Sequence, residues 1–120
     1  MTDNTIVTLA DSNYFEMLNE LIDSINQHPG SKKISICVLD AGLKDDQVRS
    51  IEKKVYKIKK ANWDIEVPNY KVGGKEWLKS QVSRAFLPNY FPEFKKYLWI
   101  DCDAWVQDWN CIELYFKACE

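Results

Sequence analysis

Short apolar runs alternate along this 120-residue chain with longer segments whose apolar residues recur at helical spacing. The short runs span residues 5–10, 34–39, 63–67 and 97–100, and their β-branched and aromatic side chains predict strands. Strands that alternate with helices favour parallel pairing, because each crossover helix returns the chain to the same end of the sheet. We therefore expect a single α/β domain over residues 1–120, with a mostly parallel sheet and helices on both of its faces.

The helical segments carry their own boundary signals. Ser12 or Asn13 is expected to cap the first helix, because short polar side chains accept hydrogen bonds from the first helical N–H groups. The second helix is expected to turn four apolar residues inward: Val48, Ile51, Val55 and Ile58. Residues 75–87 are expected to form a third helix, and residues 111–119 a short final one.

Composition and charge exclude several classes of protein. The hydrophobic fraction of 46% is too high for a disordered chain. The net charge of −2 provides no general attraction for nucleic acid. No apolar run reaches the roughly 20 residues that a membrane span requires, and residues 1–4 lack the basic flank of a signal peptide. We therefore expect a soluble, cytoplasmic protein without a membrane span or a nucleic-acid partner.

The cysteines do not have the spacing of a metal site. The chain has four of them, and no two form a Cys-x-x-Cys pair: Cys37, Cys102, Cys111 and Cys119. They lie among apolar and aromatic residues and not in turn-rich loops. We expect reduced, mostly buried thiols, with a disulfide or a reactive thiol as the alternative.

Aspartates follow three of the four expected strands. They are Asp11, Asp40 and Asp101. In open parallel sheets, ligands bind in the crevice outside the carboxyl ends of the strands. The polar residues of this chain therefore lie where such a fold binds its ligand.

The expected strand at residues 97–100 leads directly into Asp101-Cys102-Asp103. Two carboxylates in one cleft need a cation, and hard oxygen donors favour Mg²⁺ or Mn²⁺. Such an ion binds a diphosphate through its remaining coordination positions. In the alternative interpretation, one aspartate caps a turn and the other is solvated. Arg84 could neutralise a phosphate or orient the carboxylates, or it could be a surface arginine.

The turn after the first strand reads Ala10-Asp11-Ser12-Asn13-Tyr14. Its carboxylate and amide could bind the edge of a nucleobase, and its phenol ring could stack on the base. The alternative is structural: a capping residue followed by a tyrosine packed at the start of a helix.

In order and spacing, these motifs resemble the nucleotide-sugar-dependent glycosyltransferases of the GT-A fold, most closely the retaining family 8 enzymes. The resemblance covers nearly the whole chain and implies a Rossmann-like nucleotide-binding half. The segment from Ala10 to Tyr14 is similar to the first motif of the family. In that motif the residues matching Asp11 and Asn13 contact uracil, and the one matching Tyr14 stacks on it.

The same resemblance implies a donor site for a UDP-sugar. Arg84 falls where the family has an arginine near the donor phosphates. Asp101 and Asp103 match the Asp-x-Asp motif, whose ion, usually Mn²⁺, holds the diphosphate. The transferred group would be a hexose, and the acceptor, a glycan or a protein, is not indicated.

Two departures from the family affect these expectations. The smaller is Ser12, which stands where close relatives often have a second acidic residue. The sequence ends at Glu120, shortly after the acidic motif, whereas the later part of family members supplies a further metal ligand and the acceptor-binding residues. We therefore expect the nucleotide-binding half of a transferase that acts within a longer or assembled protein, possible arrangements being a homo-oligomer or a separate second half. No catalytic base is assigned.

Two other functions fit parts of the sequence. All five tryptophans fall in the second half, which would suit a non-enzymatic protein-interaction module or an inactive transferase fragment. A phosphatase with an Asp-x-Asp motif is a remote alternative, since there the motif follows the first strand and a Thr or Val commonly occupies the position that Trp105 has here. Metal-dependent UDP binding and phosphate-ester hydrolysis distinguish these functions.

Overall fold

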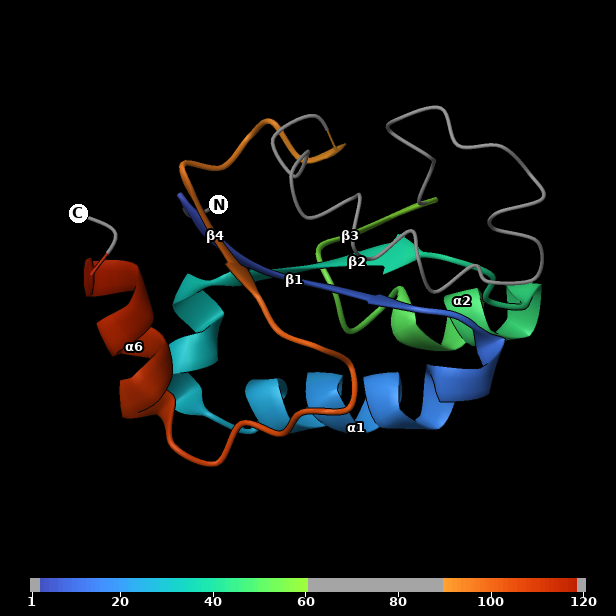
Figure 1. The fold of residues 1–120 in the computed structure, drawn as a ribbon, viewed down its shortest axis with the longest axis horizontal. Coiled ribbons are helices and arrows are strands. Elements are labelled where there is room, and N and C mark those ends of the chain that lie inside the picture. The colour runs from blue at the N-terminus through green and yellow to red at the C-terminus, as the bar shows by residue number, and fades with distance from the viewer. Residues whose placement is uncertain (1–2, 61–89, 119–120) are drawn as a thin grey trace, which may run out of the picture.

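A sheet of parallel strands forms the centre of the structure, a computed structural model that describes residues 3–60 and 90–118 (Figure 1). The described sheet has four strands in the order β3-β2-β1-β4. They are β1 (Asn4–Ala10), β2 (Ser35–Asp40), β3 (Lys57–Lys60) and β4 (Lys96–Trp99). All three pairings are parallel. The predicted α/β fold with a parallel sheet is therefore confirmed.

The two central strands are buried on both faces. Residues 5–10 of β1 and 36–39 of β2 are buried, and the two strands pair in register from Thr5 with Ser35 to Ala10 with Asp40. Continuous apolar runs are typical of parallel strands that are covered on both sides. This burial makes β1 and β2 the rigid base from which the neighbouring turns project.

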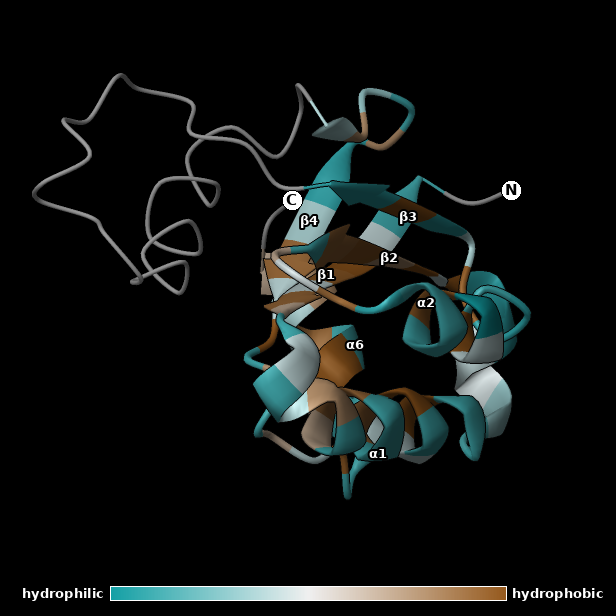
Figure 2. Cartoon of the chain, turned by 90° about the vertical axis from the view of Figure 1, so that its right-hand side faces the viewer, coloured by the Kyte–Doolittle hydropathy of each residue, from teal (hydrophilic) through white to brown (hydrophobic). Residues whose placement is uncertain are grey.

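The described helices pack against one face of the sheet. They are α1 (Phe15–Asn26), α2 (Asp45–Ile51) and α6 (Trp109–Ala118). Figure 2 shows the hydrophobic side of α1 turned toward the sheet. The residues that α1 buries include the four that its spacing predicts: Leu18, Leu21, Ile22 and Ile25. From α6, Ile112 and Phe116 join the same core. None of the described helices is long and apolar enough to cross a membrane.

Aromatic side chains cover the other face of the sheet. Tyr90, Phe91 and Phe94 pack there against Val7 and Leu39. Tyr97 of β4 holds this segment, because its single hydroxyl hydrogen is shared between the carbonyl oxygens of residues 91 and 94. Among residues 3–60 and 90–118, α-helices thus cover one side of the sheet and this aromatic layer covers the other. The helix expected at residues 75–87, which could cover the second face, lies outside the described residues.

The structure corrects the second predicted helix. The observed helix α2 ends at Ile51. Residues 57–60, which were expected at the end of the helix, form the strand β3. Val55 and Ile58 still pack against the core, but from the turn and the strand. The amide of Tyr56 donates to the carbonyl of Ile36 (2.8 Å), which starts the pairing with the open edge of β2. This edge supplies hydrogen-bonding groups that the helical spacing of the apolar residues does not reveal.

Other boundaries differ less. Asp11, and not Ser12 or Asn13, accepts the capping hydrogen bonds of the 3₁₀ turn η1 (Ser12–Tyr14) that precedes α1. A second 3₁₀ turn, η2 (Pro29–Lys33), follows α1. The strand expected at residues 63–67 and the helix expected at 75–87 lie outside the described residues.

The described cysteines are free thiols, as expected from the sequence. Cys37 is buried, Cys102 is half-buried and Cys111 is exposed. The expectation of burial is therefore wrong for Cys111. Cys119 lies outside the described residues.

Candidate nucleotide-sugar and metal site

The order of the described strands reverses between β1 and β4. From β1 the chain crosses to β2 and β3 on one side, and then returns to β4 on the other side of β1. At such a reversal the connections leave in opposite directions, and the carboxyl ends of the two strands border a crevice. Asp11 directly follows β1, and Asp101 follows β4 by two residues. Two of the predicted site segments thus lie at the ends of neighbouring strands.

The turn after β1 is fixed by its own hydrogen bonds. Oδ1 of Asp11 accepts from the amides of Asn13 (2.9 Å) and Tyr14 (3.3 Å). Ala10 is buried, and its carbonyl accepts from the amide of Ala41. Asn13 and Tyr14 are exposed, with 46% of Tyr14 accessible. Asp11 therefore has the structural role of a cap, while the amide and phenol side chains project into solvent.

The turn after β2 supports the first turn. Oδ1 of Asp40 accepts from the amides of Gly42 (2.8 Å) and Leu43 (2.6 Å). Gly42 has a φ of +139°, a backbone conformation that is strained for residues with a side chain. Its carbonyl oxygen accepts a hydrogen bond from the amide of Ser12 (3.1 Å). Asp40 thus shapes a loop that holds the end of β1.

The acidic pair flanks a side chain that packs inward. Cys102 is half-buried and packs against the core on the helical side of the sheet, whereas Asp101 and Asp103 are exposed. The carbonyl of Asp101 accepts from the amide of Ala104 (3.0 Å), which closes the turn. Oδ1 of Asp101 accepts from the indole N–H of Trp99 (3.0 Å). Burial of Cys102 therefore holds the two carboxylates at the surface.

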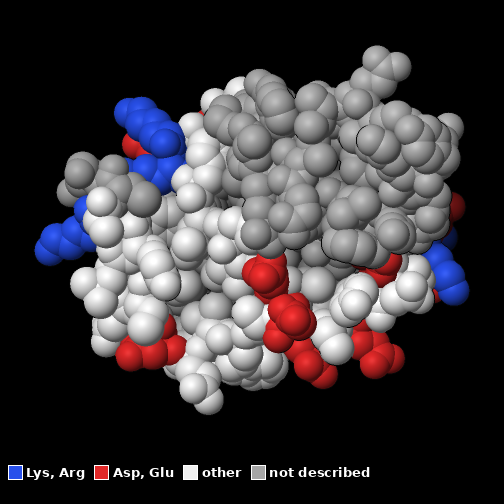
Figure 3. Space-filling model, viewed as in Figure 1, with Lys and Arg blue, Asp and Glu red and all other residues white. Residues whose placement is uncertain are grey.

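The carboxylates of this region raise the pKa of the Cys102 thiol. Burial raises the pKa of the Cys102 thiol, the negative charges of Asp103, Asp101 and Asp11 contribute to the rise, and together they bring it to about 11. Carboxylates from both strand ends thus act on the same thiol. On the face of the molecule that Figure 3 shows, several Asp and Glu side chains lie near the middle, and the Lys and Arg side chains lie toward the sides.

The donor atoms present suit a hard divalent cation. Mg²⁺ in proteins is commonly held by one or two carboxylates together with water and substrate phosphates. Asp101 and Asp103 supply such a pair. Within residues 3–60 and 90–118, no three His, Cys, Asp or Glu side chains lie close enough to hold a metal by themselves. The pair therefore fits an ion whose coordination a ligand completes.

Comparison with known families identifies the domain. The family model "Glycosyl transferase family 8" matches residues 5–114 of the chain. The chain belongs to glycosyl transferase family 8. A comparison with curated protein sequences finds no significant match. The match spans β1 through most of α6, so this family 8 domain includes both strand ends and the acidic motif.

The acidic pair of the family 8 domain borders a hollow between β4 and α6. Its volume is about 640 Å³. Asp101, Asp103, Trp99, Trp105 and Tyr115 are among the residues that line it. Carboxylates and aromatic residues from β4, α6 and the segment between them thus line the same hollow.

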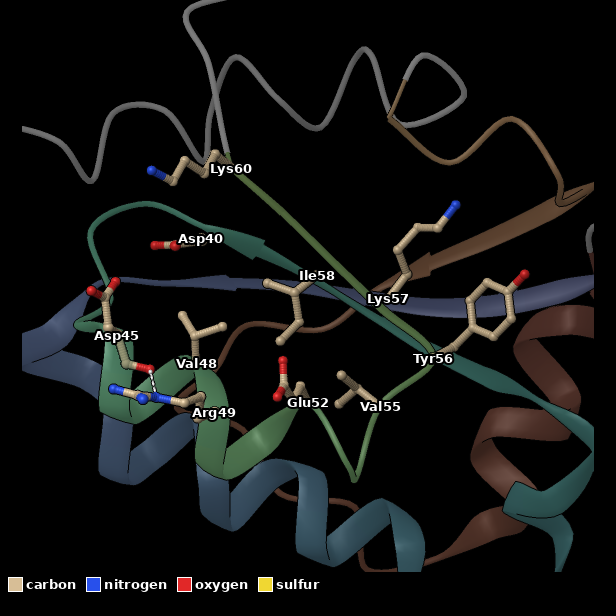
Figure 4. A pocket seen from close by; sticks show the side chains of 10 residues that line it. All are labelled: Asp40, Asp45, Val48, Arg49, Glu52, Val55, Tyr56, Lys57, Ile58 and Lys60. Atoms are coloured by element: carbon tan, nitrogen blue, oxygen red, sulfur yellow. Dashed lines mark hydrogen bonds between the residues drawn. The ribbon is translucent and has the colours of Figure 1, made fainter.

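A second hollow lies between α2 and β3 (Figure 4). Its volume is about 730 Å³, and Val48 and Ile58 line it together with charged side chains such as Arg49 and Lys60. Asp40, one of the three strand-end aspartates, lines it, but none of the residues that the sequence assigns to the nucleotide or the metal is among its described lining. In the described parts of the family 8 domain, the predicted residues thus gather at the ends of β1 and β4.

The remaining differences between the sequence prediction and the structure concern Arg84 and Trp99. Arg84 lies outside the described residues, so its proximity to the phosphates stays a prediction. The contact of Trp99 with Asp101 was not predicted, because a tryptophan in a strand is usually a packing residue. The signal for it is the spacing, since residues two apart in a strand point to the same face.

Proposed function

We propose that this family 8 glycosyltransferase domain binds a UDP-sugar donor through a divalent cation, Mn²⁺ or Mg²⁺, held by Asp101 and Asp103. One observation carries the proposal: the acidic pair and the turn from Ala10 to Tyr14 follow adjacent strands at the point where the strand order reverses. This is where an open α/β sheet binds its ligand. It also suits a ligand with two ends, a base and a diphosphate.

The nucleoside end belongs to the turn after β1. The exposed amide of Asn13 and the carboxylate of Asp11 offer hydrogen-bonding atoms to the edge of uracil. Tyr14 offers an exposed ring for stacking. Oδ1 of Asp11 already caps η1, so the base would meet a carboxylate whose orientation is fixed before binding. A fixed group loses little entropy when a ligand binds.

The diphosphate end belongs to the acidic pair. A bound divalent cation supplies positive charge that stabilises the departing diphosphate. Asp101 and Asp103 hold that charge beside the β1 turn, and Arg84 is proposed to bind the donor phosphates. The described residues offer no assigned acceptor base. We therefore attribute leaving-group binding to this chain and the complete hexosyl transfer to a longer or assembled protein.

Titration calorimetry tests the proposal. UDP is titrated into the protein with Mn²⁺ and then with a chelator, and both titrations are repeated on the Asp101→Asn, Asp103→Asn double variant. Asp108→Asn is the matched control, because Asp108 lines the same hollow and Asn can replace its cap to the amide of Asn110. We expect saturable binding that requires the metal and the pair and survives in the control. Absence of UDP binding to the folded wild type with Mn²⁺ would refute the proposal.

Protein interaction is the second candidate function, and exposed apolar side chains support it. Trp105, Leu114 and Tyr115 are 53%, 65% and 61% accessible. Monomeric proteins rarely expose large apolar patches without a binding role. If UDP does not bind, light scattering of the wild type and of Leu114→Asp over a range of concentrations tests self-association, which the substitution should weaken.

A further inference from the structure

We propose that Trp99 is a positioning residue for the metal site: its indole N–H fixes the Asp101 carboxylate in the orientation that receives the divalent cation. The proposal rests on the proposed function, because it concerns the same acidic pair. It assigns a role to a side chain that the sequence alone indicates only as part of the packing.

The backbone brings these two side chains together. Trp99 is the last residue of β4, where it pairs with Val7 of β1. The amide of Ile100 also donates to the carbonyl of Val7 (3.0 Å), so extended backbone continues toward Asp101. Side chains two residues apart on extended backbone project to the same side. The indole nitrogen and Oδ1 of Asp101 are accordingly 3.0 Å apart.

Packing fixes the indole before any ligand binds. Trp99 is half-buried and packs against the cluster that includes Val7, Leu9 and Phe91. Val7 and Phe91 are completely buried, so the ring rests on a rigid surface. Asp101, by contrast, is exposed. The contact thus joins a donor anchored by packing to an exposed carboxylate.

The chemistry of indole suits this role. Its N–H is a donor only and carries no charge. It therefore orients a carboxylate without neutralising it, whereas a lysine or arginine in this place would compete with the cation. A carboxylate has about four lone-pair sites, so one oxygen can accept the indole N–H while the group still binds a metal. Loss of a group that orients a metal ligand typically weakens metal affinity by 10- to 100-fold.

Metal affinity separates this role from simple packing. Trp99→Phe keeps an aromatic ring against the cluster and removes the N–H. Trp105→Phe is the matched control, because Trp105 lines the same hollow and is 53% accessible. Mn²⁺ binding in the presence of UDP is measured by electron paramagnetic resonance of the free ion, after circular dichroism has shown that each variant is folded. We expect at least a tenfold weaker Mn²⁺ affinity for Trp99→Phe and an unchanged affinity for Trp105→Phe.

A spectroscopic measurement on the wild type gives a second readout. In protein labelled with ¹⁵N-tryptophan, the indole cross-peak of Trp99 is assigned by its absence from the spectrum of Trp99→Phe. If that variant does not fold, the cross-peak that Asp101→Asn moves most is assigned to Trp99. We expect Mg²⁺ with UDP to shift this cross-peak more than that of Trp105.

The outcomes are distinct. Wild-type Mn²⁺ affinity in folded Trp99→Phe, or a Trp99 cross-peak that Mg²⁺ with UDP does not move, overturns the role of Trp99 and leaves the UDP site standing. A wild type that binds no Mn²⁺ with UDP overturns the proposed function, and the role of Trp99 with it.

Discussion

The imidazole of His28 stacks on the indole of Trp109, with the ring centroids 5.6 Å apart and 28° between the ring planes. Nε2 of His28 also lies 3.0 Å from the carbonyl oxygen of Val106. The amide of Val106 in turn donates to the buried hydroxyl of Ser24 (3.1 Å). The segment that leaves the acidic pair is thus fastened to α1 and to the loop after it before α6 begins.

Gly30 is the close neighbour of this stack, and replacing it should disturb the attachment. A Cβ at position 30 would lie 2.3 Å from Nε1 of Trp109, so the indole would have to move. We expect Gly30→Ala to lower the free energy of unfolding by about 1–3 kcal/mol, the usual cost of overpacking. Urea denaturation followed by circular dichroism measures the change.

The control for this prediction relieves the same clash. In the Trp109→Leu background the indole is absent, and Gly30→Ala should then cost much less than in the wild type. Equal costs of Gly30→Ala in the two backgrounds would show that the ring is not the obstacle.

Asn13 should matter for the ligand and not for the fold. Its side chain is exposed, and the cap of η1 comes from Asp11. Asn13→Ala should therefore change the free energy of unfolding by less than about 0.5 kcal/mol. One lost hydrogen bond to the base of about 1.4 kcal/mol should weaken UDP binding roughly tenfold. Calorimetry and urea denaturation of the same variant measure the two effects.

Asp11 provides the contrast to Asn13. Asp11→Ala removes the two hydrogen bonds that Oδ1 accepts and should cost about 1 kcal/mol of stability, whereas Asp11→Asn should retain the cap. If Asn13→Ala leaves UDP affinity at the wild-type value, the nucleoside does not use this amide.

The sequence predicts those elements that the core itself defines. β1 and β2 are read correctly because both of their faces are buried, and α1 because its inward residues follow helical spacing. β3 is missed because three of its four residues are lysines. Their long side chains keep the charge outside, as Lys59 does over the ring of Phe91 (5.7 Å). Whether such a segment is a strand depends on the open edge of β2, which local spacing does not reveal.

The candidate site is predictable in part for a similar reason. Aspartates after apolar runs indicate strand ends, and strand ends indicate the ligand crevice. The sequence does not show that Asp40 serves its own loop through the amides of Gly42 and Leu43, because its position resembles that of Asp11 and Asp101. Asp11 and Asp40 each accept from the backbone amides two and three residues later, whereas Asp101 accepts the indole N–H of Trp99. Hydrogen-bond partners therefore separate Asp101 from the other two, which residue types do not.

The ion pair between Lys57 and Glu93 joins β3 to the aromatic layer, and its contribution should depend on pH. Nζ of Lys57 lies 2.8 Å from Oε2 of Glu93. This hydrogen bond lowers the pKa of Glu93 below its ordinary value of 4.5 and raises that of Lys57 above 10.5. A lowered carboxyl pKa gives stability that is present above pH 4.5 and lost as the pH falls through the folded-state value. A raised lysine pKa gives stability that is lost only as the pH rises above 10.5.

Lys57→Met should therefore destabilise the protein most near neutral pH. The difference in the free energy of unfolding between wild type and variant should shrink toward zero as the pH is lowered from 7 to 3. Lys53→Met, at an exposed lysine of the turn before β3, is the control and should show no such trend. A difference that stays constant between pH 7 and pH 3 would mean that packing of the lysine stem, and not the charge pair, is what Lys57 contributes.

Thiol reactivity should separate the described cysteines by their surroundings. Burial raises the pKa of Cys37 to about 11, and its sulfur accepts a hydrogen bond from the hydroxyl of Thr5 (3.3 Å). Cys111 is exposed on α6. Because the thiolate is the reacting species, only about one Cys37 side chain in a thousand is reactive at pH 8, and it is also inaccessible in the fold.

We expect iodoacetamide at pH 8 to modify Cys111 at least a hundredfold faster than Cys37 in the folded protein, as measured by mass spectrometry of tryptic peptides. In urea, where β1 and β2 no longer cover the sulfur, the two rates should become similar. Equal rates in the folded protein would contradict the prediction, because they would show that β2 opens often enough to expose Cys37.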